Sequence, residues 1–296
     1  MDKLRELLDR QPVLLGDGAM GTMLFAAGLE AGSSPELWNV EQPERVMAVH
    51  RAYAEAGSNL ILSNTFGGNR LRLVRHNLGE RTTELNRAGA KIAREAVAGI
   101  AHPVLIGGDM GPTGEMFAPL GALEEAEAID AFAEQAAALQ EGGVDYFQVE
   151  TFGDLREIEA AIQGIRKVSQ LPIVATMSFD TRRRTMMGVR PEDAARRLVA
   201  LGVAAVGSNC GAGLDDTLFT VGQMHQSAPE AVVVSKSNAG LPKHGPGGSV
   251  IYEGSPEMMA DYALHAMEAG ARIIGACCGS SPVHLRAMAR ALGMMD

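Results

Sequence analysis

Short apolar runs alternate with longer segments of helical apolar spacing along the whole chain. Eight runs have the length and composition of buried strands, at residues 13–16, 59–63, 104–108, 146–149, 173–178, 205–208, 232–237 and 272–275. The helical patterns fall around and between them, at 2–10, 43–56, 82–100, 123–141, 154–169, 191–201, 214–227, 256–269 and 282–292. Strands that alternate with helices in this way are typical of a parallel sheet.

Eight strand–helix units in 296 residues predict an α/β protein with a single (β/α)8 barrel, the TIM-barrel fold, in one domain over residues 1–296. The alternative is an open sheet with helices on both faces. The barrel is favoured because the set of eight is complete and no linker or change of composition divides the chain. The first helix, 2–10, precedes the first strand, and we expect it to cover the bottom of the barrel.

Polar residues stand at the C-terminal ends of nearly all the predicted strands. In barrels of this kind the chemistry gathers at that rim. The residues placed there, in chain order, are Asp17, Asn64, Thr65, Asp109, Glu150, Ser178, Asp180, Asn209, Cys210, Asn238, Cys277 and Cys278. The sequence therefore predicts a single site on this rim.

The chain contains three cysteines in total. Cys210 ends the sixth predicted strand, and Cys277 and Cys278 end the eighth, so the three sulfurs can converge. Three thiolates can hold one zinc ion with its fourth position open, which is typical of a catalytic zinc. Buried cysteines that act only as small apolar residues are the alternative for each one singly. A disulfide between the adjacent pair would be strained and needs an oxidising setting. We predict zinc.

Two acids and a glycine-rich segment lie on the same rim. Asp17 and Glu150 suit a clamp for a substrate ammonium group, or they cap the following helices at the surface. Spacing alone does not decide between these. In the segment 17–22, Asp-Gly-Ala-Met-Gly-Thr, backbone N–H groups can approach a carboxylate closely, or the glycines only make a turn.

Two further segments allow two interpretations each. Residues 238–249 form a glycine- and proline-rich stretch that acts either as a lid over the site or as an inert surface loop. The stretch Arg182–Arg184 is either a solvated loop, which is the commoner case, or a docking patch for an acidic partner.

Composition excludes several classes of protein. The net charge is −10 without a long basic run, so we expect no nucleic-acid partner. No stretch approaches the roughly 18 apolar residues of a membrane span, and the charged N-terminus does not suit a signal peptide. A cytoplasmic protein is therefore expected, and a homo-oligomer is left open. The motifs of zincin proteases, P-loop proteins and Gly-x-Ser-x-Gly hydrolases are lacking.

The motifs together resemble the homocysteine S-methyltransferase family. The resemblance runs from about residue 11 to residue 292 and is greatest to the homocysteine-binding module of cobalamin-dependent methionine synthase. It rests on six segments with the sequences Asp-Gly-Ala-Met-Gly-Thr, Asn-Thr-Phe-Gly, Gly-Pro-Thr-Gly-Glu, Glu-Thr-Phe, Ser-Asn-Cys and Gly-Ala-Cys-Cys-Gly, at 17–22, 64–67, 111–115, 150–152, 208–210 and 275–279.

The resemblance implies a zinc enzyme that methylates L-homocysteine to methionine. It implies that Cys210, Cys277 and Cys278 are the Zn2+ ligands. It also implies that Asp17 and Glu150 bind the substrate amino group. The substrate-binding residues it implies also include Gly18, Ala19 and Thr22 around the carboxylate, Asn209 beside the first cysteine, and Asn238, which in methionine synthase modules can occupy the zinc when substrate is absent.

The chain departs from the family pattern at two places, 62–66 and 275–277. The first reads Leu-Ser-Asn-Thr-Phe instead of Glu-Thr-Asn-Thr-Phe, and the second reads Gly-Ala-Cys instead of Gly-Gly-Cys. Neither difference falls on a proposed ligand. The chain stops soon after the barrel pattern, so we expect it to carry no folate or cobalamin module.

The mechanistic hypothesis is that zinc converts the homocysteine thiol into a thiolate, which attacks an activated methyl group. The donor stays open among betaine, S-methylmethionine, S-adenosylmethionine and a methyl-corrinoid protein. An aromatic content of 4% with one tryptophan offers little for a quaternary ammonium cage, which favours the last three. The alternative function is a stand-alone homocysteine-binding subunit that needs a separate methyl-corrinoid protein. A zinc hydrolase is disfavoured by a shell of three thiolates.

Overall fold

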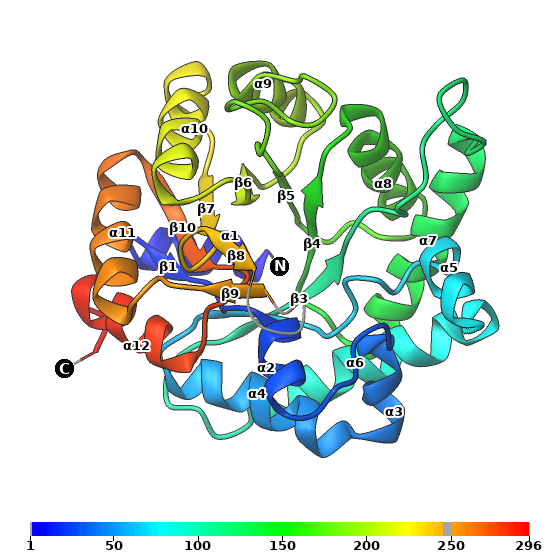
Figure 1. Ribbon diagram of the computed structural model, residues 1–296, viewed down its shortest axis with the longest axis horizontal. Helices are drawn as coiled ribbons and strands as arrows, with labels where there is room; N and C mark the ends of the chain where they lie inside the picture. The colour runs from blue at the N-terminus through cyan, green and yellow to red at the C-terminus, as the bar shows by residue number, and fades with distance from the viewer. Residues whose placement is uncertain (1, 245–249, 296) are drawn as a thin grey trace.

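A closed barrel of eight parallel strands forms the centre of the computed structural model, which describes residues 2–244 and 250–295 (Figure 1). In space the strands follow the order β1-β10-β7-β6-β5-β4-β3-β2. A bridge from Gly16 to Leu60, with the Asn59 amide donating to the Leu15 carbonyl at 2.7 Å, joins β1 to β2 and closes the ring. The barrel strands are β1 (Leu14–Leu15), β2 (Leu60–Leu62), β3 (Leu105–Met110), β4 (Tyr146–Phe152), β5 (Ile173–Met177), β6 (Ala205–Cys210), β7 (Val233–Ser237) and β10 (Ala271–Ala276).

The predicted helices are confirmed with shifts of a few residues at their ends. They are α1 (Lys3–Arg10), α4 (Pro43–Glu55), α6 (Thr82–Ala96), α7 (Glu125–Gly142), α8 (Leu155–Val168), α9 (Pro191–Ala200), α10 (Leu214–Ser227), α11 (Pro256–Glu268) and α12 (Pro282–Ala291). All but α1 form the outer ring around the strands (Figure 1). The predicted (β/α)8 fold is therefore confirmed, and the open sheet is excluded by the closure between β1 and β2.

Short helical turns on the C-terminal side of the barrel were not predicted. They are α2 (Met20–Ala26), α3 (Trp38–Glu41) and α5 (Arg70–Leu73), with the 3-10 turns η1 (Pro35–Leu37), η2 (Val74–His76) and η3 (Gly79–Arg81). One or two helical turns are too few for an apolar period to be detected. They build the wall of the rim that follows β1 and β2.

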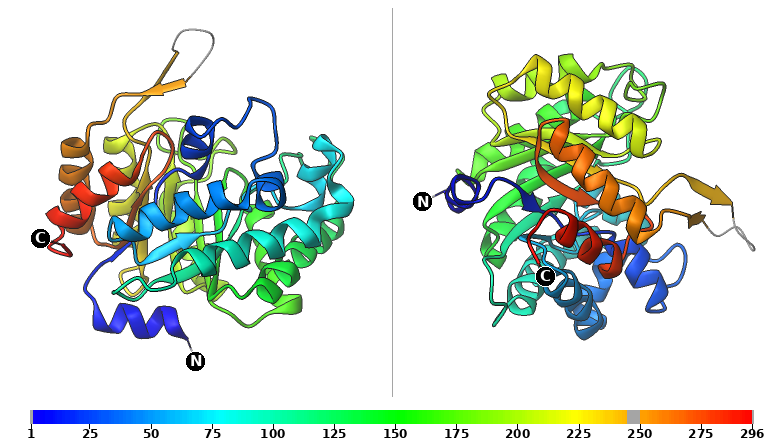
Figure 2. Two further views of the ribbon diagram at one scale, coloured as in Figure 1. Left: turned by 90° about the horizontal axis from the view of Figure 1, so that it is seen from below. Right: turned by 90° about the vertical axis from the view of Figure 1, so that its left-hand side faces the viewer.

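Helix α1 closes the bottom of the barrel, as the sequence predicts. Its Leu4, Leu7 and Leu8 join the inward-facing strand residues in one buried cluster. Lys3 fixes its orientation by donating to Asp145 at 2.7 Å. Figure 2 shows α1 lying across the end of the barrel opposite to the hairpin described next.

A two-stranded antiparallel hairpin begins in the glycine- and proline-rich stretch and ends just after it. Its strands are β8 (Pro242–His244) and β9 (Val250–Tyr252), and it projects from the barrel (Figure 2). The part of the predicted lid at 245–249 lies outside the described residues. Strands of three residues, one of them opening on proline, give no alternation that a sequence reading can detect.

Candidate active site

A cavity of about 1080 Å³ opens at the C-terminal ends of the barrel strands. The short helix α2 and the segment before η1 form much of its apolar wall. The predicted rim residues that line it are Asp17, Gly18, Ala19, Thr22, Asn64, Thr65, Asp109, Glu150, Cys210, Cys277 and Cys278. The strand-end argument therefore located one site, and these predicted residues come from six of the eight barrel strands or the segments that follow them.

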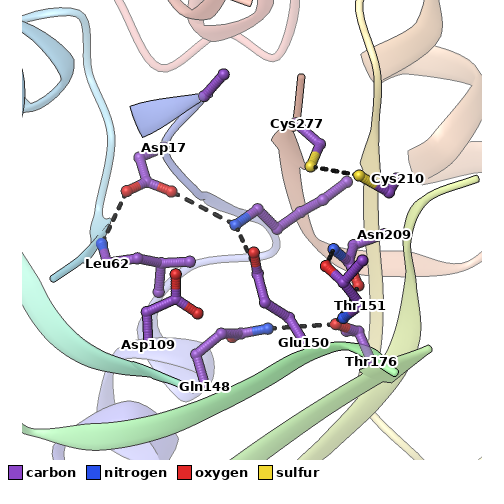
Figure 3. Close-up of polar contacts among 12 residues, drawn as sticks. Asp17, Leu62, Asp109, Gln148, Glu150, Thr151, Thr176, Asn209, Cys210 and Cys277 are labelled. Carbon is purple, nitrogen blue, oxygen red and sulfur yellow. Dashed lines mark hydrogen bonds and ion pairs between the residues drawn. The ribbon is translucent and has the colours of Figure 1, made fainter. Parts of the chain in front are cut away.

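The three thiols converge at one side of this cavity. Cys210 Sγ lies 3.0 Å from Cys277 Sγ and 3.8 Å from Cys278 Sγ, and all three sulfurs lie within 4.8 Å of one another. β6 and β10 are separated only by β7, which brings their ends together. Figure 3 shows the Cys210 and Cys277 sulfurs pointing toward one another. The cysteines are free thiols, half-buried, so the expected convergence is confirmed.

Asn238 ties the two cysteine segments together. Its Oδ1 accepts the Cys278 N–H at 3.1 Å, and its Nδ2 donates to the Gly211 carbonyl at 3.2 Å. Cys210 has a positive φ of 58°, which is uncommon for a residue other than glycine, and Gly211 follows it with a φ of 76°. Asn238 is buried and is not among the described residues that line the cavity. Its amide therefore holds the thiols in place from behind.

The thiol cluster favours a bound cation. Hydrogen bonds from the Cys210 and Cys277 thiols lower the pKa of Cys278 to about 3, while the same contacts raise the pKa of Cys210 far above its usual value. One thiolate thus forms easily, and each further ionisation meets the charge already there. A divalent ion that accepts soft sulfur ligands removes this penalty, and Zn2+ has that chemistry. The donor set fits zinc.

Two buried acids face the cavity from the other side. Asp17 follows β1 and Glu150 lies in β4, and they are 3% and 6% exposed. This burial rules out the alternative of surface caps. The Asp17 Oδ2 atom accepts the Leu62 N–H at 2.8 Å (Figure 3). Burial raises the pKa of Asp17 to about 6 and also raises that of Glu150.

Lys236 of β7 was not singled out by the sequence reading. Its Nζ donates to Glu150 Oε2 at 3.2 Å and to Asp17 Oδ1 at 3.5 Å. Burial opposes its charge most strongly, but the neighbouring negative charges together, those of Glu150 and Asp17 first, raise its pKa well above the usual value. The available signal was a lysine inside an otherwise uncharged strand, Val-Val-Val-Ser-Lys-Ser at 232–237.

The segment 17–22 is fastened to the residues that follow the cysteine pair. A Cβ on Gly18 would lie 2.5 Å from Ser280 Oγ, so this close approach requires glycine. The Ala19 N–H donates to Ser280 Oγ at 3.0 Å, and Thr22 Oγ1 accepts the Gly279 N–H at 3.1 Å. The Ala19 amide is thus already engaged, and helix α2, which begins at Met20 without a side-chain cap, presents its first turn to the cavity.

Both polar atoms of the Asn209 side chain are hydrogen-bonded within the protein. Its Oδ1 accepts the Thr151 N–H at 2.8 Å and the Thr176 hydroxyl at 2.7 Å, and its Nδ2 donates to Thr151 Oγ1 at 2.6 Å. Thr151 has a φ of 67°, a strained value for a β-branched residue. Asn209 is buried and is not one of the described cavity-lining residues. It links the ends of β4, β5 and β6 beside Cys210.

The basic stretch at 182–184 is exposed in the segment that follows β5. Arg183 pairs with Asp216 at 2.8 Å, and its guanidinium lies 4.0 Å from the centre of the Phe219 ring. This arginine is therefore engaged with α10. The docking interpretation of the stretch stays a prediction.

A (β/α)8 barrel carries three converging thiols and two buried acids around one rim cavity, and the thiols form a group that could hold a metal ion. The chain matches the family described as homocysteine S-methyltransferase over residues 14–292 and belongs to that family. In the part of the chain that the structure describes, no helix has both the length and the apolar character needed to span a bilayer.

Curated and solved relatives agree with this assignment. Methionine synthase of Mycobacterium tuberculosis is 33% identical over 97% of this chain, and that of Mycobacterium leprae is 32% identical over 95%. The chain spans about a quarter of the length of these two proteins. The oxidised form of the Escherichia coli homocysteine methyltransferase MmuM matches with 26% identity and a TM-score of 0.82, covering 97% of this chain and 98% of that one. Its metallated form matches with a TM-score of 0.79.

Proposed function

We propose that this chain transfers a methyl group to the thiol of L-homocysteine and so produces methionine, with Zn2+ held by Cys210, Cys277 and Cys278. The observation that carries the proposal is the joint presence of three converging thiols and two buried acids in one cavity. The first group suits a sulfur-binding cation, and the second suits an ammonium group. Homocysteine carries both a thiol and an ammonium.

Each end of the substrate has a partner in this proposal. The ammonium group lies between Asp17 and Glu150. The carboxylate lies at the segment of Gly18, Ala19 and Thr22, where the first turn of α2 carries backbone N–H groups that suit an anion. Asn209 and Asn238 serve the site by positioning Thr151 and the cysteine segments.

A zinc ion held by the three thiolates supplies a lowered pKa for the substrate thiol, so that a thiolate meets the methyl donor. The protein residues contribute orientation. Two acids and a backbone anion site fix the zwitterionic end of the substrate, which leaves its sulfur directed at the cysteines. Such fixation removes part of the entropic barrier before the reaction begins.

A separate methyl-corrinoid protein is one candidate for the methyl donor, beside several small molecules. The curated relatives are named methionine synthase, and they extend well beyond the segment that this chain matches. Betaine, S-methylmethionine and S-adenosylmethionine are the small-molecule candidates. A donor screen on the zinc-loaded chain, repeated with a methyl-corrinoid protein added, separates an enzyme that uses a small donor from a homocysteine-binding subunit.

We also propose that the reaction takes place in the cytoplasm. Three free thiols at contact distance stay available for a metal only in a reducing compartment. The thiol state in freshly lysed cells, measured by alkylation and mass spectrometry, tests this. Mostly reduced cysteines support it, and mostly oxidised cysteines contradict it.

The Cys210→Ala variant tests the proposed function. Loss of one of three ligands should remove most of the bound zinc and lower methionine formation at least 100-fold, because a metal site of this type depends on its full ligand set. Metal analysis and a methionine assay with the active donor provide the measurement. Ser227→Ala, at the end of α10, serves as the control. A zinc-free variant with full activity would sink the proposal.

A further inference from the structure

Lys236 occupies the interior of the site between the two acids assigned to the substrate. Its side chain is 6% exposed, and those of Asp17 and Glu150 are 5% and 8% exposed. Both ion pairs are long, at 3.5 and 3.2 Å, so the lysine does not saturate either carboxylate. The lysine also lines the cavity, where a ligand can reach the same carboxylates.

The neighbouring strands leave room for this lysine. In the sheet Lys236 pairs with Asn209 on one side and with Gly275 on the other. A Cβ on Gly275 would approach the Lys236 Cγ to 3.1 Å and the Asp17 carbonyl to 3.2 Å. Glycine at this position therefore gives the lysine stem its path to the acids.

Lys236 faces more acidic groups than it can neutralise. Two ionised carboxylates face a single ammonium group. A third acid, Asp109, is buried nearby, and its Oδ1 has no hydrogen-bond partner among the described residues. Burial raises the pKa of Asp109 well above its usual value. Lysine, Asp17 and Glu150 thus leave one net negative charge, which the ammonium of a zwitterionic substrate would neutralise.

Two buried carboxylates without a lysine would behave differently. Like charges that share a desolvated site cannot both ionise, so one of them would take up a proton. A protonated acid accepts a weaker hydrogen bond from an ammonium group than a carboxylate does. Lys236 opposes the effect of burial by lowering the pKa of Asp17 and of Glu150, which favours the charged form of both acids before any substrate arrives.

We propose that Lys236 is a positioning residue that holds Asp17 and Glu150 ionised and spaced for the ammonium group of the substrate. The site thereby selects a thiol that carries an α-ammonium group over the same thiol without one. This inference rests on the proposed function, because it takes homocysteine as the ligand. It assigns to Lys236 no contact with the reacting sulfur.

The Lys236→Met variant tests the inference by selectivity. Calorimetric titration of the zinc-loaded protein should be made with L-homocysteine and with 4-mercaptobutanoate, which lacks the amino group. We expect the affinity for homocysteine to fall about 10- to 100-fold, the range for a hydrogen bond to a charged group. The affinity for 4-mercaptobutanoate should change by about twofold at most. In turnover, KM for homocysteine should rise while kcat at saturation stays within about threefold.

Two further variants complete the design. Lys167→Met removes an exposed lysine of α8 that pairs with Asp130, and it should leave both affinities unchanged. Lys236→Gln removes the charge but keeps a polar side chain, and it provides the same comparison if the methionine variant does not fold or does not retain zinc.

The outcomes distinguish the two levels of the proposal. If the wild-type protein binds no homocysteine, the proposed function fails. If the wild type binds it and Lys236→Met binds it equally well, the role of Lys236 fails while the function stands. Tighter binding by the variant also overturns the inference, because it would mean that the lysine competes with the substrate ammonium. An equal loss of affinity for both thiols would indicate a merely structural lysine.

Discussion

Single residues of this site were predictable by type and place, but their partners were not. Asp17 and Glu150 stand at strand ends, so their rim position follows from the strand pattern. Their burial and their shared partner Lys236 depend on β7, which is far away in sequence. Asn209 is predicted at the substrate, and the pattern gives no sign of the hydrogen bonds that its amide makes with Thr151 and Thr176. The sequence does not encode such pairings locally.

The buried carboxyl of Asp17 should make stability depend on pH. Its pKa is near the model-compound value of 3.8 when unfolded and about 6 when folded, chiefly because burial penalises the charge. The folded protein therefore holds this proton more tightly. The resulting stability is fully present below about pH 4 and is lost as pH rises through 6, a change of about 3 kcal/mol.

Urea unfolding of the metal-free protein between pH 4 and 7.5 measures this effect. Asp17→Asn keeps an acceptor for the Leu62 N–H and has no proton to lose. Its free energy of unfolding should decline less over this range than that of the wild type. Parallel declines in the two proteins would contradict the assignment.

Elements place the site by bringing strand ends together. The thiols lie at the end of β6 and directly after β10, β7 carries Lys236 and leads into Asn238, and β4 carries Glu150. The long helices and the barrel strands were predictable because their periods extend over many residues. The short turns α2, α3 and α5 and the hairpin β8–β9 were not, because each of these helices and strands is only three to seven residues long and shows no detectable period. These unpredicted elements supply part of the cavity wall.

The connection between β6 and β10 should control metal affinity. Asn238→Ala removes the hydrogen bonds to Cys278 and Gly211 without removing a thiol. We expect zinc affinity to fall on the order of 10-fold, the usual cost of losing a group that positions metal ligands. Competition with a chromogenic chelator measures it. Unchanged affinity would show that the cysteine segments hold their geometry without Asn238.

In the whole molecule, the residues that close the bottom of the barrel and the residues of the site lie at opposite ends. Helix α1 packs its leucines against the interior at the bottom of the barrel, and the cavity lies at the opposite end. In such barrels the bottom serves stability and the C-terminal rim serves function. Figure 2 shows both ends in one view.

Leu4→Ala should therefore weaken the fold and leave the site intact. The side chain is 1% exposed, so its truncation should cost about 2–5 kcal/mol in the free energy of unfolding. Zinc and homocysteine affinities at 25 °C should stay unchanged. Chemical denaturation and calorimetry provide the two measurements, with Leu120→Ala, at an exposed position, as the control. A variant of normal stability would contradict the role of α1.

The most direct test of the account is the sulfur count around zinc. X-ray absorption of the zinc-loaded protein should give three sulfur ligands at about 2.3 Å without substrate and four when L-homocysteine is added. With L-selenohomocysteine a zinc–selenium shell should appear in place of the fourth sulfur. An unchanged zinc environment on saturation with either compound would contradict the central claim that these three cysteines hold a metal for the substrate thiol.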